Sequence, residues 1–400
     1  MPKVIVEKVI DNLYVLRLDD DKVKYFESSW YIPEGITYNA YLLLTENSVV
    51  LFDTWKHTYI NEFIEALNKL VDIKDITHIV VHHMEPDHSG CLPKILELNN
   101  YRAKVLGHIL TGRMIKSFYG IEPKFKEVKD GEETVIDGLR LRFIHTPWLH
   151  WPETIMTYIE DYEVLLSGDA FGGFSIPKTV FDEDDEVVSN YLPYVRKYVA
   201  TIIGHYKEHI VKNISKIVDL GMSVKVVAPL HGLIWCKLPK TIIDYYLKLA
   251  KATPDKKILV IYSSMYGFVE KAVIEAIKEV KKQGFNVKVF KFTDTYYDNV
   301  GDLIGEAIDS AGIMIGTATY ESSIFPYMNY VAQLLVQKIG AQKPVLIISC
   351  YGWGGVAGKQ LLRILSKNFK VIDIIEFNGT PSTDVLEKIR KGVEKLTTLK

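Results

Sequence analysis

The stretch that decides the fold is His83-Met84-Glu85-Pro86-Asp87-His88, which places four metal-binding side chains within six residues. It follows residues 77–82 (THIVVH), a short run of apolar and β-branched residues that predicts a strand. Functional side chains gather in loops at one edge of a sheet. The sequence therefore predicts a metal site where this strand ends.

Three later strands are predicted to end in loops of the same kind. Residues 139–145 (LRLRFIH), 163–167 (EVLLS) and 224–229 (VKVVAP) precede His150, Asp169 and His231, respectively. The full candidate set is His83, Glu85, Asp87, His88, His150, Asp169 and His231. Seven ligands are too many for one tetrahedral zinc but suffice for two metals that share a carboxylate. Imidazoles and carboxylates without a thiolate suit iron.

Two further histidines adjoin this set. His82 lies at the end of the first strand, and His145 at the end of the second. On residue type and position alone both are close alternatives to this set; the family resemblance described below favours His150 and leaves both in a supporting role. His57, His78, His108, His205 and His209 are expected to have no part in the site.

A new pattern begins near Thr253-Pro254-Asp255, which divides the chain into predicted domains 1–252 and 253–400. After this point short apolar strands alternate with helices. The strands are 257–262, 286–291, 312–316, 344–349 and 370–374. This alternation predicts a doubly wound, five-stranded parallel sheet with helices on both faces.

Ligands of such sheets bind at the carboxyl ends of the strands, where three polar loops are predicted. A loop that joins a strand to a helix N-terminus can hold a phosphate on its backbone N–H groups. Aromatic side chains in the other two loops could flank a flat ring. The candidate residues are Ser263, Ser264, Met265, Tyr266 and Gly267; Thr317, Ala318, Thr319 and Tyr320; and Tyr351, Gly352, Trp353 and Gly354.

Composition narrows the classes of protein. The formal net charge of -2 gives no basic footprint for nucleic acid. Neither a signal peptide nor an apolar run of roughly 18 residues is present, so we expect no membrane contact and a cytoplasmic location. The three cysteines, Cys91, Cys236 and Cys350, form no C-x-x-C pair, so no thiolate-bound iron module is appended.

The ligand pattern resembles that of the metallo-β-lactamase superfamily, H-x-H-x-D-H, with Glu85 in place of its second His. This Glu variant, joined to a flavodoxin-like domain, is similar to the flavodiiron proteins. The phrases HMEPDHSG, TPWLHWPET, SGDAFGGF and PLHGLIW also resemble that family. The resemblance implies an N-terminal metallo-β-lactamase-like αββα sandwich and a C-terminal flavodoxin-like domain that binds FMN.

The resemblance also implies roles for single residues. His83, Glu85 and His150 would hold one iron, and Asp87, His88 and His231 the other. Asp169 would bridge the two, and Tyr198 would donate a hydrogen bond near their open side. Two departures stand out: Phe268 and Val269 occupy positions where relatives often carry Ser or Thr, and Glu27 stands where relatives often place a His.

The implied activity is reduction of dioxygen to water, of nitric oxide to nitrous oxide, or of both, which would protect an anaerobic or microaerobic cell. Reduced FMN and two ferrous ions together hold the four electrons that dioxygen needs. The implied electron donor is rubredoxin or a reduced deazaflavin coenzyme, and the implied assembly is a head-to-tail homodimer or a dimer of dimers. The alternatives are a zinc-dependent hydrolase and a flavin electron carrier with an inactive metal domain.

Overall fold

A computed structural model describes residues 2–398, which fold as two compact units. One unit comprises the chain up to Tyr198 together with Tyr206–Leu247, and the other comprises Val199–His205 and the chain from Lys248 onward. We keep 1–252 and 253–400 as the proposed domain limits, because that division follows the end of helix α7 (Pro239–Ala250).

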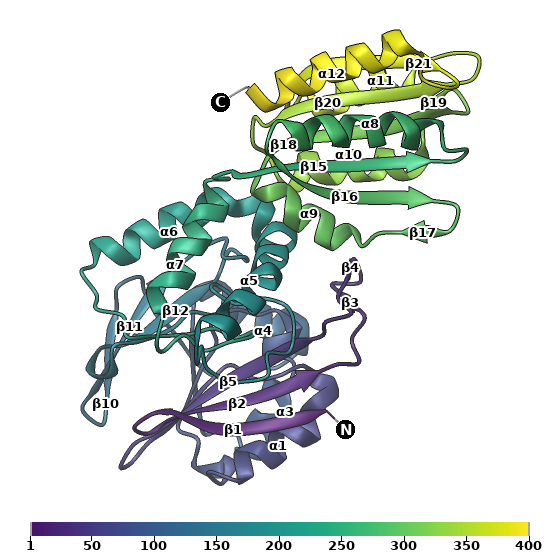
Figure 1. Cartoon of the computed structure of the whole chain (residues 1–400). Helices are drawn as coiled ribbons and strands as arrows, with labels where there is room; N and C mark the ends of the chain where they lie inside the picture. Colours follow the sequence, from purple (N-terminus) through teal and green to yellow (C-terminus); the bar gives the residue numbers. More distant parts are fainter. Residues whose placement is uncertain (1, 399–400) are drawn as a thin grey trace. The chain divides into compact units, whose positions relative to one another are not determined.

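Two sheets form the centre of the N-terminal unit (Figure 1). The first has the order β1-β2-β5-β6-β7-β8-β9 and the second the order β10-β11-β12-β13-β14. The strands of the first sheet are Lys3–Ile10, Leu13–Asp20, Ile36–Leu44, Val49–Phe52, His78–Val80, Lys104–Gly107 and Lys124–Glu127. Those of the second are Glu133–Ile136, Leu139–His145, Ile155–Ile159, Val164–Leu166 and Val226–Ala228. A separate hairpin pairs β3 (Tyr25–Phe26) with β4 (Trp30–Tyr31).

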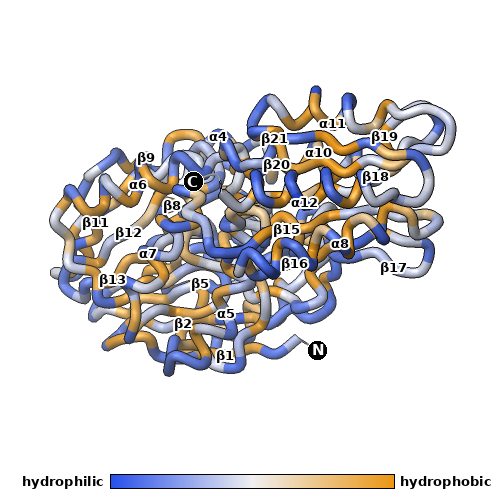
Figure 2. Tube along the Cα trace, turned by 45° about the horizontal axis from the view of Figure 1, so that its top comes forward, coloured by the Kyte–Doolittle hydropathy of each residue, from blue (hydrophilic) through white to orange (hydrophobic). Residues whose placement is uncertain are grey.

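The two sheets pack face to face through one apolar core. Val15, Leu43 and Phe52 of the first sheet join Phe143 and Leu166 of the second in this core, and all five are fully buried. Helices cover the outer faces of the sheets, as the predicted αββα sandwich requires (Figures 1 and 2). The helices of the unit are α1 (Ile60–Asn68), α2 (Pro86–Ser89), α3 (Leu92–Leu98), α4 (Ile109–Tyr119), α5 (Asp185–Tyr198), α6 (Lys207–Asp219) and α7.

The C-terminal unit is built on a parallel sheet with the order β16-β15-β18-β20-β21. Its strands are β15 (Asp255–Ser264), β16 (Asn286–Thr293), β18 (Ser310–Tyr320), β20 (Pro344–Tyr351) and β21 (Lys370–Asn378). Short antiparallel strands β17 (Tyr296–Tyr297) and β19 (Ser323–Ile324) extend it. In chain order the parallel strands run second, first, third, fourth, fifth, the arrangement of flavodoxin-like folds. The predicted five-stranded parallel sheet is therefore confirmed.

Helices cover both faces of this parallel sheet. The helices α8 (Phe268–Lys282) and α12 (Thr383–Thr398) pack together on one face, and α9 (Val300–Ile308), α10 (Pro326–Lys338) and α11 (Ala357–Leu365) form a second group. Strands β15 and β20 are largely hydrophobic along their length, as expected for strands buried on both faces (Figure 2). No helix in the described part of the chain is both long and apolar enough to cross a membrane.

Candidate metal centre and flavin pocket

The ligand loop begins where β7 ends, and neighbouring residues hold it in place. Pro86 opens the short helix α2, which carries Asp87 and His88, both buried. The Glu153 carboxylate accepts a hydrogen bond from the Met84 backbone N–H at 2.9 Å. Glu153 is fully buried, and a fixed carboxylate at this point sets the direction in which the loop leaves the strand.

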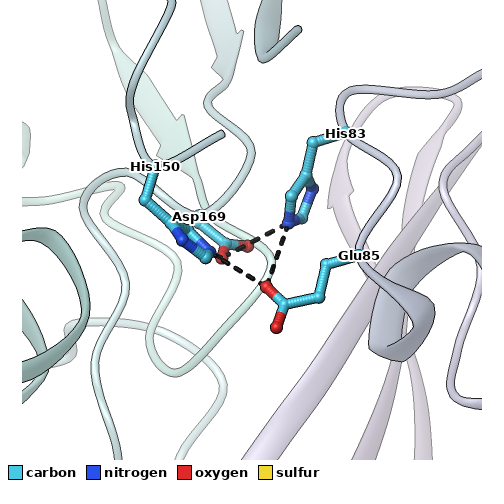
Figure 3. A group of neighbouring side chains, drawn as sticks. All are labelled: His83, Glu85, His150 and Asp169. Atoms are coloured by element: carbon cyan, nitrogen blue, oxygen red, sulfur yellow. Dashed lines mark hydrogen bonds and ion pairs between the residues drawn. The ribbon is translucent and has the colours of Figure 1, made fainter. Parts of the chain in front are cut away.

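One set of four donors lies on one side of the site (Figure 3). His150 Nε2 lies 2.9 Å from Glu85 Oε2 and 3.1 Å from Asp169 Oδ2. His83 Nε2 lies 3.7 Å from the same Glu85 oxygen and 3.5 Å from Asp169 Oδ2. Four donor atoms that converge in this way match the demands of a divalent cation.

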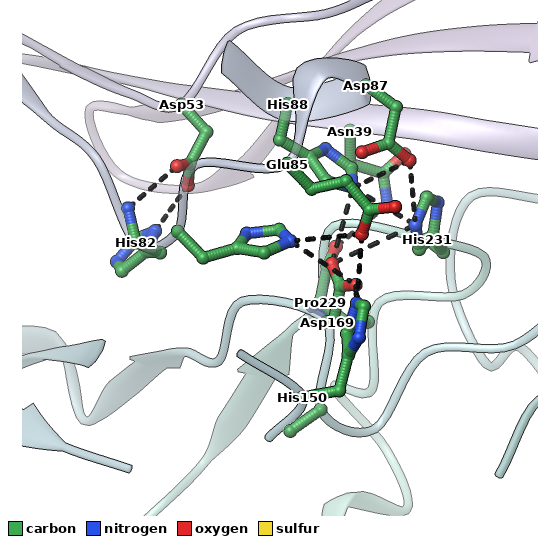
Figure 4. A network of polar contacts seen from close by, with 12 residues as sticks. Asn39, Asp53, His82, Glu85, Asp87, His88, His150, Asp169, Pro229 and His231 are labelled. Carbon is green, nitrogen blue, oxygen red and sulfur yellow. Dashed lines mark hydrogen bonds and ion pairs between the residues drawn. The ribbon is translucent and has the colours of Figure 1, made fainter. Parts of the chain in front are cut away.

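A second set lies beside the first (Figure 4). His88 Nε2 is 3.0 Å from His231 Nε2 and 3.2 Å from Asp169 Oδ1. Asp87 Oδ2 lies 3.5 Å from His88 Nε2 and 3.6 Å from His231 Nε2. The other ring nitrogen of His231 donates to the Thr37 carbonyl at 2.7 Å, which leaves Nε2 free of a proton and able to bind metal.

Asp169 belongs to both sets. Its Oδ2 faces His83 and His150, and its Oδ1 faces His88, with His231 at 3.8 Å. The Tyr198 hydroxyl donates a hydrogen bond to Oδ2 at 2.8 Å. The carboxylate of Asp169 is thus placed between two groups of donors, as a bridging ligand would be.

The two adjoining histidines point elsewhere. His82 contacts the Asp53 carboxylate through Nδ1 and Thr157 Oγ1 through Nε2, the latter at 2.9 Å (Figure 4). His145 Nε2 lies 2.9 Å from the Val128 carbonyl. Both rings are occupied by partners outside the two donor sets, in keeping with the supporting role expected for them.

The electrostatics of the cluster favour a cation. Burial raises the pKa of Asp87 to about 7, and neither of its carboxylate oxygens has a hydrogen-bond partner among the described residues. Burial works against protonation of His150, but Asp169 and Glu85 outweigh it and raise the pKa to about 10. Burial would also raise the pKa of Glu85, yet hydrogen bonds from His150 and His83 lower it to about 2. In the absence of metal, bound protons balance the negative charge of the buried carboxylates. Two divalent ions would supply that positive charge instead, so the residues fit an iron pair.

A small cavity of about 230 Å³ opens onto the ligand loop. Tyr38 and Lys56 line it together with Glu85 and Asp87. The β3–β4 hairpin contributes Phe26 and Glu27, the latter with a φ of 48°. Glu27, which the sequence marks as a departure from relatives, therefore lies at the entrance to the metal site.

A second cavity, of about 340 Å³, lies at the carboxyl ends of the parallel strands, where a flavin is expected. Its wall is mostly apolar and aromatic. Trp353 is 97% exposed and Tyr266 is 82% exposed beside it, so a flat ring would cover large aromatic surfaces that are otherwise in water. The lining fits the ring of FMN.

Most of the predicted flavin residues line this cavity: Ser264, Met265, Tyr266, Ala318, Thr319, Tyr320, Tyr351, Gly352 and Trp353. Four others do not. Ser263 and Thr317 are buried within β15 and β18, Gly267 caps α8 with a φ of 80°, and Gly354 lies beyond the wall. The structure adds Phe268, Val269, Glu321, Cys350 and Gly379 to the wall.

Sequence reasoning missed several residues around the metal site. Tyr38 packs its ring against His231, with centroids 5.7 Å apart, and Glu153 fixes the ligand loop. Asn39 donates to the carbonyls of Pro229 and Gly232, which flank His231 (Figure 4). Tyr38 and Asn39 come from β5, and nothing in the local sequence signals that their side chains reach the site.

Comparisons with known proteins agree with this geometry. A family model described as the ODP family beta lactamase matches residues 36–232. A nitric oxide reductase from Moorella thermoacetica is 30% identical over 88% of this chain and 88% of its own length. A mutant of the flavo di-iron protein from Thermotoga maritima has a TM-score of 0.93 at 40% identity, covering 99% of each chain. Rubredoxin oxygen:oxidoreductase from Desulfovibrio gigas has a TM-score of 0.92 at 25% identity, covering 98% of each chain.

The fold, the two donor sets and these relatives together define an oxidoreductase with a metallo-β-lactamase-like unit and a flavodoxin-like unit. The chain belongs to the flavodiiron proteins. The family, the fold class and the FMN and diiron cofactors expected from the sequence are thereby confirmed. The role of each single ligand remains a prediction.

Proposed function

We propose that this protein reduces dioxygen to water, nitric oxide to nitrous oxide, or both. The observation that carries the proposal is Asp169, whose two oxygens face two separate donor sets. Relatives support it, since one is named a nitric oxide reductase and another rubredoxin oxygen:oxidoreductase. Glu85 replaces a lactamase-type His, and the flavodoxin-like unit has no use in hydrolysis, so a zinc hydrolase is the weaker candidate.

We assign a separate proposed role to each group of ligand residues. His83, Glu85 and His150 would hold one iron, Asp87, His88 and His231 the other, and Asp169 would join them. Two ferrous ions and reduced FMN supply the electrons, while the protein positions them and tunes their surroundings. The cavity of about 230 Å³ lined by Tyr38 has room for a diatomic substrate, because a water molecule occupies only about 30 Å³.

Tyr198 is the proposed catalytic side chain beside the iron pair. Its hydroxyl is buried and donates to Asp169, and burial together with the Asp169 charge raises its pKa well above 10. A phenol that stays protonated at every working pH can hold a hydrogen bond on the bridging carboxylate without releasing its proton. This hydrogen bond fixes the orientation of Asp169 between the two donor sets.

Electrons must arrive from a partner. The names of two relatives, a flavorubredoxin and a rubredoxin oxygen:oxidoreductase, support a rubredoxin-type donor. A reduced deazaflavin coenzyme is the second candidate. We further propose a head-to-tail homodimer or a dimer of dimers, and a cytoplasmic location, in keeping with three cysteines that form no disulfide.

Reducing the iron-loaded protein anaerobically and then supplying dioxygen or nitric oxide tests the proposal. Consumption of dioxygen or nitric oxide, with two iron ions bound per chain, is the expected result. Two zinc ions per chain together with hydrolytic activity, and no consumption of either gas, would replace the proposal with the hydrolase. Comparing the two gases on one preparation also settles which of them is preferred.

A further inference from the structure

The loop that would hold the flavin phosphate is followed by two helix positions without a hydroxyl side chain. Phe268 and Val269 are the first two residues of α8, and both line the flavin cavity. Val269 is 2% exposed, and its side chain packs into the apolar core of the C-terminal unit. At the point where a helix N-terminus meets a phosphate, this chain therefore presents two apolar side chains.

Two hydroxyls that line the cavity, those of Ser264 and Thr319, accept hydrogen bonds from backbone N–H groups, whereas the Ser263 hydroxyl is buried within β15 and does not line the cavity. Ser264 Oγ accepts hydrogen bonds from the backbone N–H groups of Gly267 and Glu270, at 3.1 and 3.4 Å. These are N–H groups of the kind that bind phosphate at a helix start, and Ser264 takes them instead. Thr319 Oγ1 likewise accepts from the N–H groups of Val356 and Ala357. The backbone N–H groups of Gly267 and Glu270 are thus already engaged within the loop and are not offered to an anion.

The charges around the loop do not favour an anion either. Among the described residues that line the cavity none is Lys or Arg, whereas Glu321 is a carboxylate. Glu270 sits in the first turn of α8 and accepts a hydrogen bond from the Tyr262 hydroxyl. Lys271 is a nearby cation, and its ammonium lies over the Phe268 ring at 5.8 Å from the ring centroid.

We propose that this pocket recognises the flavin ring and hardly reads the 5′-phosphate, so that it prefers FMN over riboflavin by less than about thirtyfold. The inference rests on the proposed flavin pocket and concerns the specificity of that pocket. The aromatic wall formed with Tyr320, Tyr351 and Trp353 is the same for either ligand, because both carry the same ring. A hydrogen bond to a charged phosphate is worth roughly tenfold or more in affinity, so losing two removes most of the discrimination.

Equilibrium titration of the flavin-free, full-length protein tests this, with quenching of flavin fluorescence as the signal. The wild-type protein should prefer FMN over riboflavin by less than about thirtyfold, because the phosphate gains few charged hydrogen bonds. Phe268→Ser with Val269→Thr should raise that preference, measured as the ratio of the riboflavin Kd to the FMN Kd, by about tenfold or more. Val289→Thr, on the exposed face of β16, is the matched control and should change neither Kd.

The outcomes separate the inference from the proposed function. A wild-type preference above about thirtyfold overturns the inference but leaves the flavin pocket in place, as does a double variant whose preference is unchanged. Failure of both FMN and riboflavin to bind the wild-type protein overturns the pocket and the inference together. Val269 is buried, so Phe268→Ser alone serves as the second variant if the double variant does not fold; an unchanged preference there also counts against the inference.

Discussion

Asp169→Asn is the most direct test of the metal centre, because it removes one charge and keeps the size of the side chain. Asp169 is fully buried, faces histidines of both donor sets and accepts the Tyr198 hydroxyl. Removing one partner from a buried ionic cluster costs about 3–5 kcal/mol. We therefore expect iron affinity to fall by roughly two to three and a half orders of magnitude.

The assay is anaerobic titration of the metal-free protein with ferrous iron, followed by metal analysis after gel filtration. Both irons should be weakened together, because one oxygen of Asp169 serves each donor set. Asp219→Asn, at the exposed end of α6, is the matched control and should bind iron like the wild type. If the Asp169 variant retains two iron ions per chain at wild-type affinity, the bridging role is wrong.

Four further predictions follow from the same structure. Tyr198→Phe removes a charged hydrogen bond worth about 1.5–3 kcal/mol, so kcat should fall roughly ten- to a hundredfold with iron content unchanged; wild-type kcat would assign the phenol to structure alone. Asp169 and Glu85 raise the pKa of His150 to about 10, so iron uptake must displace the proton on this ring. Iron affinity should therefore rise from pH 6 to pH 9, and a pH indicator should detect the released protons. An iron affinity that does not change with pH would contradict this. Burial raises the pKa of Cys91 to about 12 and also raises the pKa of Cys350, so both thiols should react slowly with maleimide at pH 7.5. Bound FMN should slow the reaction of Cys350 further, because Cys350 lines the flavin cavity. If mass spectrometry finds no effect of FMN on this rate, the result would argue against the pocket. Arg17→Met leaves the buried Asp19 carboxylate without its guanidinium partner and removes the donors to the half-buried carbonyls of Pro177 and Thr179. The free energy of unfolding should therefore drop by about 3–5 kcal/mol in urea, whereas Arg140→Met at an exposed position should change it little.

The metal site was largely predictable because its ligands follow strands. The alternation of apolar residues locates each strand, and the polar residue after it is then a candidate. The choice between His145 and His150 is different. Both lie near the end of one strand, and only the fold shows that the Val128 carbonyl occupies the ring of His145. Sequence reasoning reached His150 by resemblance, not from spacing.

The flavin pocket shows where sequence reasoning stops. β15 continues to Ser264, two residues beyond the predicted strand, and the side chain of Ser263 is buried inside the unit as a result. Side chains on a strand alternate between faces, so an error in where a strand ends changes which residues face the ligand. Glu153 and Tyr38 escaped notice for another reason, since nothing in their local sequence reports contacts with a loop far along the chain.

His82 and His83 are neighbours in sequence with separate duties. The first is held by Asp53 and Thr157, and the second faces the metal cluster. For protein engineering, this means that the segment should accept substitutions nearby but not changes in its length. A library that varies side chains around it keeps each ring on its own side. A library that shortens or lengthens the segment by one residue shifts both rings relative to their partners, so mutagenesis of this site should conserve length before it conserves composition.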